Sequence, residues 1–309
     1  MVRFDIKAIS PIPTPANRLN WELLSIPSKD AFRVLFQSSH LHAISLSGFQ
    51  DFPYNFLDGS HIKRLEIRNT HCTAPPAIVH PKAISTRTQL ESIHTDQTIC
   101  LSHLTSDGIC ITSNLKTLDI CLDRGQILNE DTWRILHLTS RSLKRLRLEF
   151  KAQALVINRH LRFPDFIALE ELTIHINQPE YFRRPSHSSC DRNIIELCVL
   201  LCDPSPRCPL NTVSISIALT ETFPKHDFFD PDLTSDWVLL DTALSNANFL
   251  FLRKVSLRLT IFFFSYNSAF REREFTEQVK ASLQRVFTSV STSPSIKFVV
   301  EVNTVKRSL

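Results

Sequence analysis

The sequence LKRLRLEF, at residues 143–150, determines how the rest of the chain is interpreted. In this stretch Leu146 and Leu148 alternate with Arg145 and Arg147. Successive side chains of a β-strand point to opposite faces of the sheet. The alternation therefore predicts a strand with one apolar and one charged face.

The same phrase recurs along the chain: an apolar residue, two variable residues, then apolar residues alternating with polar ones. Its copies begin at Leu41, Ile62, Leu90, Leu115, Leu143, Leu169, Leu210 and Leu252, with a ninth, less regular copy at Ile296. The first six copies are 21 to 28 residues apart, and the later ones are 41 to 44 residues apart. Leucine-rich repeats run at roughly 20–29 residues, and insertions in them form loops on one face. We therefore expect an α/β, leucine-rich-repeat-like solenoid with a curved parallel sheet, and with helices or irregular loops on its outer face.

The domain organisation follows from the repeat. The chain has 309 residues, 43% hydrophobic and 21% charged, which is an ordinary composition for a globular protein. We expect an N-terminal lead at residues 1–27, partly irregular, followed by a single repeat domain at residues 28–309. Amphipathic segments between the phrases predict helices at residues 29–39, 130–140, 194–202, 236–246 and 273–289. Ser28 is the expected N-cap of the first helix.

Several classes of function are disfavoured by composition. The four glycines are too scattered to build a phosphate-binding loop or a dinucleotide fingerprint, so no nucleotide cofactor is expected. The net charge of +4 is too small to indicate nucleic acid or a membrane surface as partner. No apolar signal segment opens the chain, so we expect a cytoplasmic or nuclear protein with reduced cysteines.

The cysteines allow two interpretations. Cys198 and Cys202 share one predicted helical face, and with Cys190, His187 or Cys208 they could form a zinc site. Cysteine is also among the most buried residue types, and this helical face is otherwise apolar. We favour burial, and we expect neither a metal site nor catalytic residues.

The polar face of the predicted strands is the candidate functional surface. Its titratable residues form the candidate partner-binding set: Glu66, Arg68, His94, Asp96, Asp119, Arg145, Arg147, Glu149, Glu171 and His175. Equivalent positions of successive copies become neighbours about 4.8 Å apart in a stacked sheet. Glu66 should then lie beside His94, His94 beside Asp119, and Glu149 beside His175. Opposite charges should meet at Arg68/Asp96, at Asp119/Arg147 and at Arg145/Glu171. Such pairs either stabilise the sheet slightly or present a mixed-charge surface to a protein partner.

Residues 32–69, with SLKRLRLEF at 142–150, LEELTIHI at 169–176 and the segment 237–259, resemble the leucine-rich-repeat-like region of fungal F-box proteins. In that family an F-box helical module binds the adaptor of a cullin-based ubiquitin ligase, and the repeats hold the substrate. The resemblance implies a substrate receptor. The sequence contains no recognisable F-box opening, so ubiquitin-ligase components are expected as partners only if an F-box precedes residue 1.

We therefore expect a non-enzymatic protein-binding module with a protein partner and no cofactor. One alternative is an enzyme whose site is assembled from distant loops, and another is a degenerate or truncated family member without a partner. Nucleic-acid binding is a further alternative, through Arg64, Arg68, Arg141, Lys144, Arg145 and Arg147. Interleaved acidic residues such as Glu66 and Glu149 argue against it.

Overall fold

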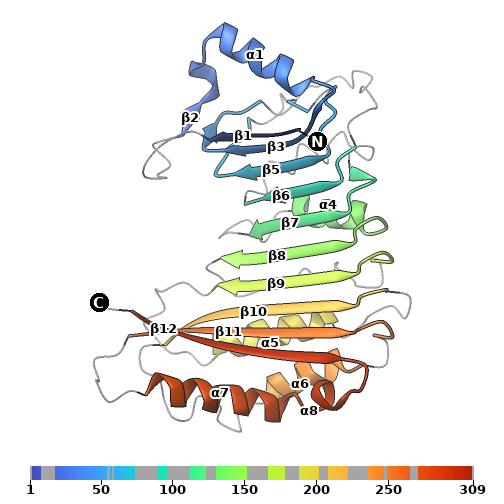
Figure 1. Cartoon of the computed structure of the whole chain (residues 1–309), viewed down its shortest axis with the longest axis vertical. Coiled ribbons are helices and arrows are strands. Elements are labelled where there is room, and N and C mark those ends of the chain that lie inside the picture. The colour runs from blue at the N-terminus through green and yellow to red at the C-terminus, as the bar shows by residue number, and fades with distance from the viewer. Residues whose placement is uncertain are drawn as a thin grey trace. The chain divides into compact units, whose positions relative to one another are not determined.

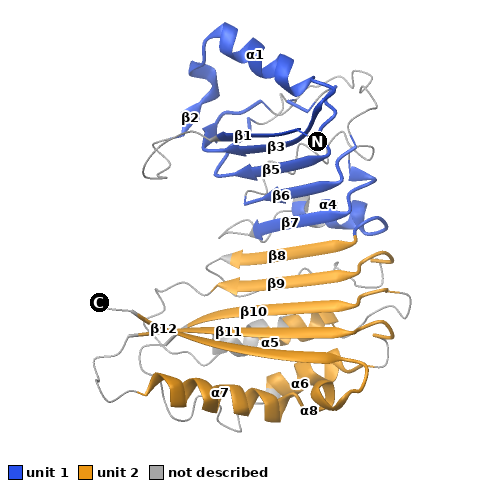
Figure 2. Ribbon diagram, in the orientation of Figure 1, with its two compact units in different colours: residues 1–143 blue, residues 144–309 orange. Residues whose placement is uncertain are grey.

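The computed structural model describes most of the repeated segments and several connections. The described residues are 2–7, 18–53, 56–57, 59–73, 89–96, 112–122, 130–151, 166–177, 188–201, 208–221, 235–246, 249–264 and 271–307. The chain divides into two compact units, residues 1–143 and residues 144–309 (Figure 2). The expectation that residues 28–309 form a single domain stays a prediction.

The first unit is built on a parallel sheet (Figure 1). Its strands, in spatial order, are β1 (Val2–Lys7), β3 (Leu41–Ser47), β5 (Arg64–Arg68), β6 (Ser92–Thr95) and β7 (Thr117–Leu122). Two short strands, β2 (Leu19–Asn20) and β4 (Phe49–Gln50), form a separate parallel ladder. The helical segments that the structure describes in this unit include η2 (Trp21–Leu23), α1 (Ile26–Phe36) and α4 (Glu130–Thr139).

The second unit contains another run of parallel strands. In order these are β8 (Arg145–Lys151), β9 (Glu171–Asn177), β10 (Thr212–Glu221), β11 (Lys254–Phe264) and β12 (Lys297–Arg307). Its helices are α5 (Ser188–Leu201), α6 (Ser235–Leu244), α7 (Glu272–Val286) and α8 (Thr288–Thr292). The protein is thus α/β, with extensive parallel sheet in both units.

Each repeated phrase of the sequence forms one strand, from β3 to β12 with the exception of the short β4. Successive strands pair in parallel within each unit, as predicted. β1 was not predicted from the sequence, and it pairs with β3 at the edge of the first unit's sheet. Its sequence, VRFDIK, alternates like the other strands but lacks the rest of the repeated phrase.

The apolar side of the strands forms the core of each unit. Five apolar residues on this side are at most 2% exposed: Leu118, Leu146, Leu148, Leu172 and Ile174. Exposure alternates along β9, where Leu172, Ile174 and Ile176 are buried and the residues between them are not. This alternation leaves one side of the sheet apolar and covered, and the other side polar.

The predicted helices are present, but three of them were placed incorrectly. The helix predicted at residues 194–202 begins earlier, at Ser188. The first helix starts at Ile26 and is capped by Ser25, whose Oγ accepts a hydrogen bond from the Ser28 backbone N–H at 3.3 Å. The segment predicted as one helix at residues 273–289 divides into α7 and α8, with non-helical dihedral angles at Phe287. The buried Asp241 carboxylate of α6 accepts hydrogen bonds from two backbone N–H groups at the start of α8. These bonds favour a separate helix start, because they satisfy N–H groups that the first turn leaves unpaired.

An aromatic cluster anchors α1 to the first unit. Its members come from η2, α1, β4 and the segment that follows β4, and they are Trp21, Phe32, Phe36, Phe49, Phe52 and Phe56. Trp21 and Phe52 meet edge to face with ring centroids 4.9 Å apart. Such contacts bury much apolar area and stabilise the packing of the helix at this end of the unit.

Candidate functional site

The candidate site is the polar side of the parallel strands, here called the polar face. In the first unit it carries the outward residues of β1, β3, β5, β6 and β7, and in the second unit those of β8 to β12. Period-two alternation places these side chains together, because their neighbours along each strand point into the core.

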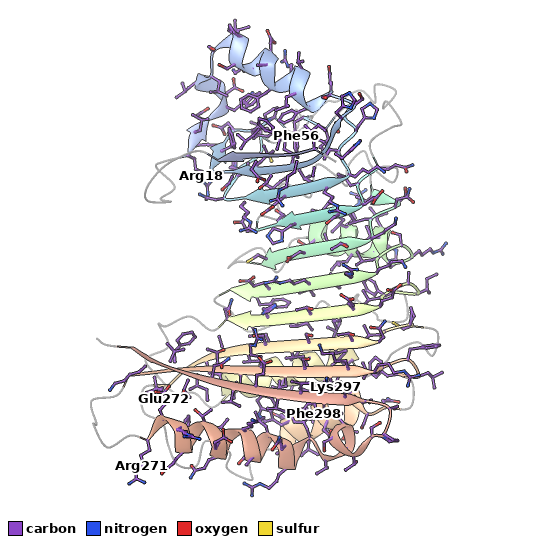
Figure 3. The ribbon with its side chains drawn as sticks, in the orientation of Figure 1. Arg18, Phe56, Arg271, Glu272, Lys297 and Phe298 are labelled. Carbon is purple, nitrogen blue, oxygen red and sulfur yellow. The ribbon has the colours of Figure 1, made fainter. Side chains whose placement is uncertain are left out.

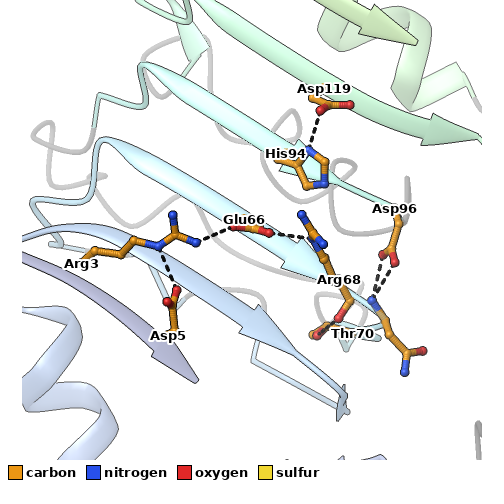
Figure 4. Close-up of polar contacts among 9 residues, drawn as sticks. Arg3, Asp5, Glu66, Arg68, Thr70, His94, Asp96 and Asp119 are labelled. Carbon is orange, nitrogen blue, oxygen red and sulfur yellow. Dashed lines mark hydrogen bonds and ion pairs between the residues drawn. The ribbon is translucent and has the colours of Figure 1, made fainter. Parts of the chain in front are cut away.

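Glu66 is the centre of an ionic network in the first unit (Figure 4). Its Oε2 lies 3.1 Å from Nη2 of Arg3, and its Oε1 lies 2.6 Å from Nε of Arg68. Arg3 also binds Asp5 on its own strand, with Nε 2.9 Å from Oδ1. Through these contacts one carboxylate joins β1 to β5, two strands that do not pair with each other.

The network passes over β3, which lies between those two strands. At the crossing the outward residues of β3 are Ala43 and Ser45, both at most 5% exposed. Next-nearest strands are roughly 9.6 Å apart, which is twice the usual strand spacing. An arginine can span this distance only where the intervening side chains are short.

The predicted contact between Arg68 and Asp96 is wrong. Arg68 binds Glu66, two residues earlier on its own strand, while both carboxylate oxygens of Asp96 accept a hydrogen bond from the Asn69 backbone N–H, at 2.8 and 3.0 Å. Asn69 has a left-handed backbone, with φ of 46°. Its N–H therefore has no partner in the β5 ladder, and the Asp96 carboxylate accepts its hydrogen bond instead.

His94 and Asp119 form the closest predicted cross-strand pair (Figure 4). They are register partners on β6 and β7, with Nδ1 of His94 2.6 Å from Oδ2 of Asp119. The predicted neighbourhood of Glu66 and His94 is confirmed by the register of β5 and β6. The carboxylate can hold a proton on Nδ1 and orient the ring, which leaves Nε2 as the nitrogen available to another molecule.

In the second unit, Arg145 and Glu171 are register partners with Nε 3.5 Å from Oε2, as predicted. Glu149 accepts a hydrogen bond from Nδ2 of Asn177 at 3.1 Å, and its other oxygen lies 3.6 Å from Nη2 of Arg147. His175 is the register partner of Glu149 on β9. The five candidate residues of this unit therefore lie together on β8 and β9.

The predicted Asp119/Arg147 contact links residues of different units and stays a prediction. Some charged residues of the polar face lie outside the predicted set, and two groups of them form ion pairs. One is Arg3 with Asp5 on the unpredicted β1, and the other is the register pair of Arg258 and Glu301, with Nη2 2.7 Å from Oε2. A search of the first residues for alternation would have found β1.

A second polar cluster, outside the predicted set, lies where strands of the first unit end. Both guanidinium nitrogens Nε and Nη2 of Arg18 donate to Oδ1 of Asn69, at 3.0 and 2.7 Å. Asn20 donates to Asp51, and His71 lies 3.7 Å from the same carboxylate. These contacts hold the short β2 and β4 ladder against the ends of the longer strands.

Arg3 on the polar face and the buried Cys208 both have a raised pKa. The hydrogen bond to Asp5, together with its charge, raises the pKa of Arg3 and keeps the guanidinium cationic. Burial raises the pKa of the Cys208 thiol. The polar face thus offers fixed charges and hydrogen-bonding groups, which suit recognition of a charged surface.

The helical cysteine predicted to be buried is buried. Cys198 is 6% exposed, and its Sγ lies 3.9 Å from the backbone oxygen of Asp236. Cys202 lies outside the described residues. Within the described ranges, no group of three or more His, Cys, Asp and Glu side chains has an arrangement that could hold a metal ion. In that same part of the chain, the helices are too short or too polar to span a membrane.

Comparisons with protein-family models, with curated proteins and with solved structures found no match to this chain.

Proposed function

We propose that the chain is a non-enzymatic protein-binding module, a leucine-rich-repeat-like solenoid whose polar face receives a protein partner. The observation that carries the proposal is the persistent alternation of buried and unburied residues along parallel strands. It leaves charged and hydroxyl side chains in adjacent rows on one side. Stacked repeats commonly use such a surface for partner recognition.

The ionic contacts on this face support recognition. Glu66 is held by two arginines and Asp119 holds His94, so these side chains are ordered before any partner arrives. Ordered side chains lose less conformational entropy on binding, which favours affinity and specificity. Along with the resemblance to F-box proteins, this supports a substrate receptor of a ubiquitin ligase as the more specific form of the proposal.

Affinity capture from a native extract tests the proposal. Glu66→Lys reverses the central charge of the first unit's network, and Glu277→Lys on the exposed surface of α7 is the matched control. We expect proteins captured by wild type and by the control to be lost with Glu66→Lys, while the thermal unfolding midpoint stays close to wild type. An identical set of captured proteins for all three chains would contradict a role of the polar face.

A further inference from the structure

Three cations gather where β11 and β12 begin. Lys254 and Lys297 are register partners on the polar face, and the backbone N–H of Lys297 donates to the Arg253 carbonyl at 2.8 Å. Figure 3 labels Lys297 at the start of β12. The side chains of all three residues are exposed. Arg253, Lys254 and Lys297 are called the basic cluster below.

The basic cluster has no compensating acid in the described part of the chain. No salt bridge there involves any of its members, and the nearby Glu301 is held by Arg258 at 2.7 Å. The segments that lead into the two strands, residues 246–253 and 293–296, contain no acidic residue. The cluster therefore carries uncompensated positive charge.

Cations also lie at the start of β8, which pairs with β9, but there they are neutralised by carboxylates. There Lys144 lies 2.7 Å from Glu170, and Arg145 lies 3.5 Å from its register partner Glu171. Two cations at the start of one strand are thus neutralised by two carboxylates at the start of the next strand. At β11 and β12 the corresponding neighbour of Lys254 is another lysine.

Like charges directly opposite each other on neighbouring strands destabilise a sheet. An anionic partner placed between the two ammonium groups would remove this repulsion and gain two ion pairs. The adjoining positions of the face are Ser214 and Ser256, which are register partners. Their half-buried hydroxyls make no hydrogen bond within the described residues, so both can donate to an incoming carboxylate.

We propose that the basic cluster binds a carboxylate-rich peptide segment of the protein partner. The inference rests on the proposed function, because it gives the partner chemistry for the second unit's share of the polar face. The next outward residues of β12 are Val299 and Glu301. A continuous phosphate backbone would also place charge against the apolar Val299, whereas a peptide can place an acidic residue at the lysines and an apolar one at Val299.

The test is fluorescence anisotropy of the full chain with a labelled peptide of alternating Glu and Ala. The isosteric Gln/Ala peptide and a single-stranded oligonucleotide are the comparison probes. The variant Lys254→Gln with Lys297→Gln removes two charges from the cluster. The control, Arg273→Gln with Lys280→Gln, removes two charges from α7.

We expect the Glu/Ala peptide to bind wild type and the control equally, with affinity falling as salt rises. The double lysine variant should bind roughly three- to thirtyfold more weakly, the effect of losing two exposed ion pairs. Equal affinity for the Gln/Ala peptide, or no effect of the lysine substitutions, would overturn the inference. Tighter binding of the oligonucleotide that depends on the two lysines would also overturn it.

The two proposals can fail separately. Loss of captured proteins with Glu66→Lys, together with no peptide binding at the basic cluster, would overturn the inference alone. Capture unaffected by Glu66→Lys would overturn the proposed function, and peptide binding at the cluster would then stand only as an isolated property of the second unit.

Discussion

Arg3 and Glu66 form an ion pair across an intervening strand, with Nη2 of the arginine 3.1 Å from Oε2 of the glutamate. β3 separates them, and its outward residues at this point are Ala43 and Ser45. The contact therefore depends on small residues in the strand between the partners. It ties the edge strand β1 to the interior of the first unit's sheet.

Glu66→Gln should loosen β1 without unfolding the unit. The substitution removes the carboxylate that binds Arg3 and Arg68, both of which are more than half exposed. Exposed ion pairs add little to global stability, so the unfolding midpoint should barely change. Hydrogen exchange measured by mass spectrometry should nonetheless be faster for the amides of Val2–Lys7. Unchanged protection of these amides, relative to a Glu277→Gln control, would show that the ion pair does not hold the strand.

Leu146→Ala should strongly destabilise the second unit. Leu146 is 2% exposed, and deletion of a buried leucine side chain leaves a cavity that the core fills only partly. The expected loss is about 2–5 kcal/mol in the free energy of unfolding, measured by urea denaturation. Arg147→Ala, one residue along on the polar face, should change this free energy by less than about 1 kcal/mol. Similar losses for both variants would mean that the assignment of faces is incorrect.

Asp241→Asn should weaken the attachment of α8. The carboxylate is 2% exposed and accepts backbone hydrogen bonds from Ser289 and Val290, each at 2.9 Å. An amide can accept only through its oxygen, and its NH2 group would face a backbone donor. We expect a loss of about 1.5–3 kcal/mol in unfolding free energy, from the value of hydrogen bonds to charged groups. Thr242→Ala is the neighbouring control, and an equal loss there would contradict a specific role for Asp241.

Cys208 should make stability fall at alkaline pH. Burial raises the pKa of its thiol, so between the unfolded and folded pKa values the folded state binds more protons than the unfolded chain. The stabilisation is complete below the pKa of the thiol in the unfolded chain, and it is lost as pH rises through the higher pKa of the folded state. Urea denaturation across this range should show a steeper decline for wild type than for Cys208→Ser. Parallel declines in the two proteins would contradict the predicted protonation difference.

The strands could be predicted because burial imposes their pattern directly. Leu172, Ile174 and Ile176 must alternate with polar residues for β9 to have one covered face. Conversely, the start of α1 could not be placed correctly, because Ser25 and Ser28 are both suitable caps and only their spatial relation decides between them. The edge strand β1 was missed because it carries the alternation without the rest of the repeat.

The ion-pair partner of a charged side chain was harder to predict than the position of that side chain in the sheet. The register that places His94 beside Asp119 follows from the repeat spacing, and the structure confirms it. Arg68 was expected to bind Asp96, but its long side chain can reach several carboxylates, and it binds Glu66 instead. A backbone N–H with no ladder partner, at Asn69, competes for the aspartate. Such choices depend on local backbone geometry, which repeat spacing does not encode.

Site-specific photo-crosslinking tests the central claim, that the polar face is the partner-binding surface, most directly. A photoreactive phenylalanine analogue would replace Thr173, which lies on the polar face of β9, or Gln278, which lies exposed on α7. In native extract, irradiation should give a discrete crosslinked species from position 173, and none from position 278. Crosslinks from position 278 alone, or from neither position, would contradict binding through the polar face.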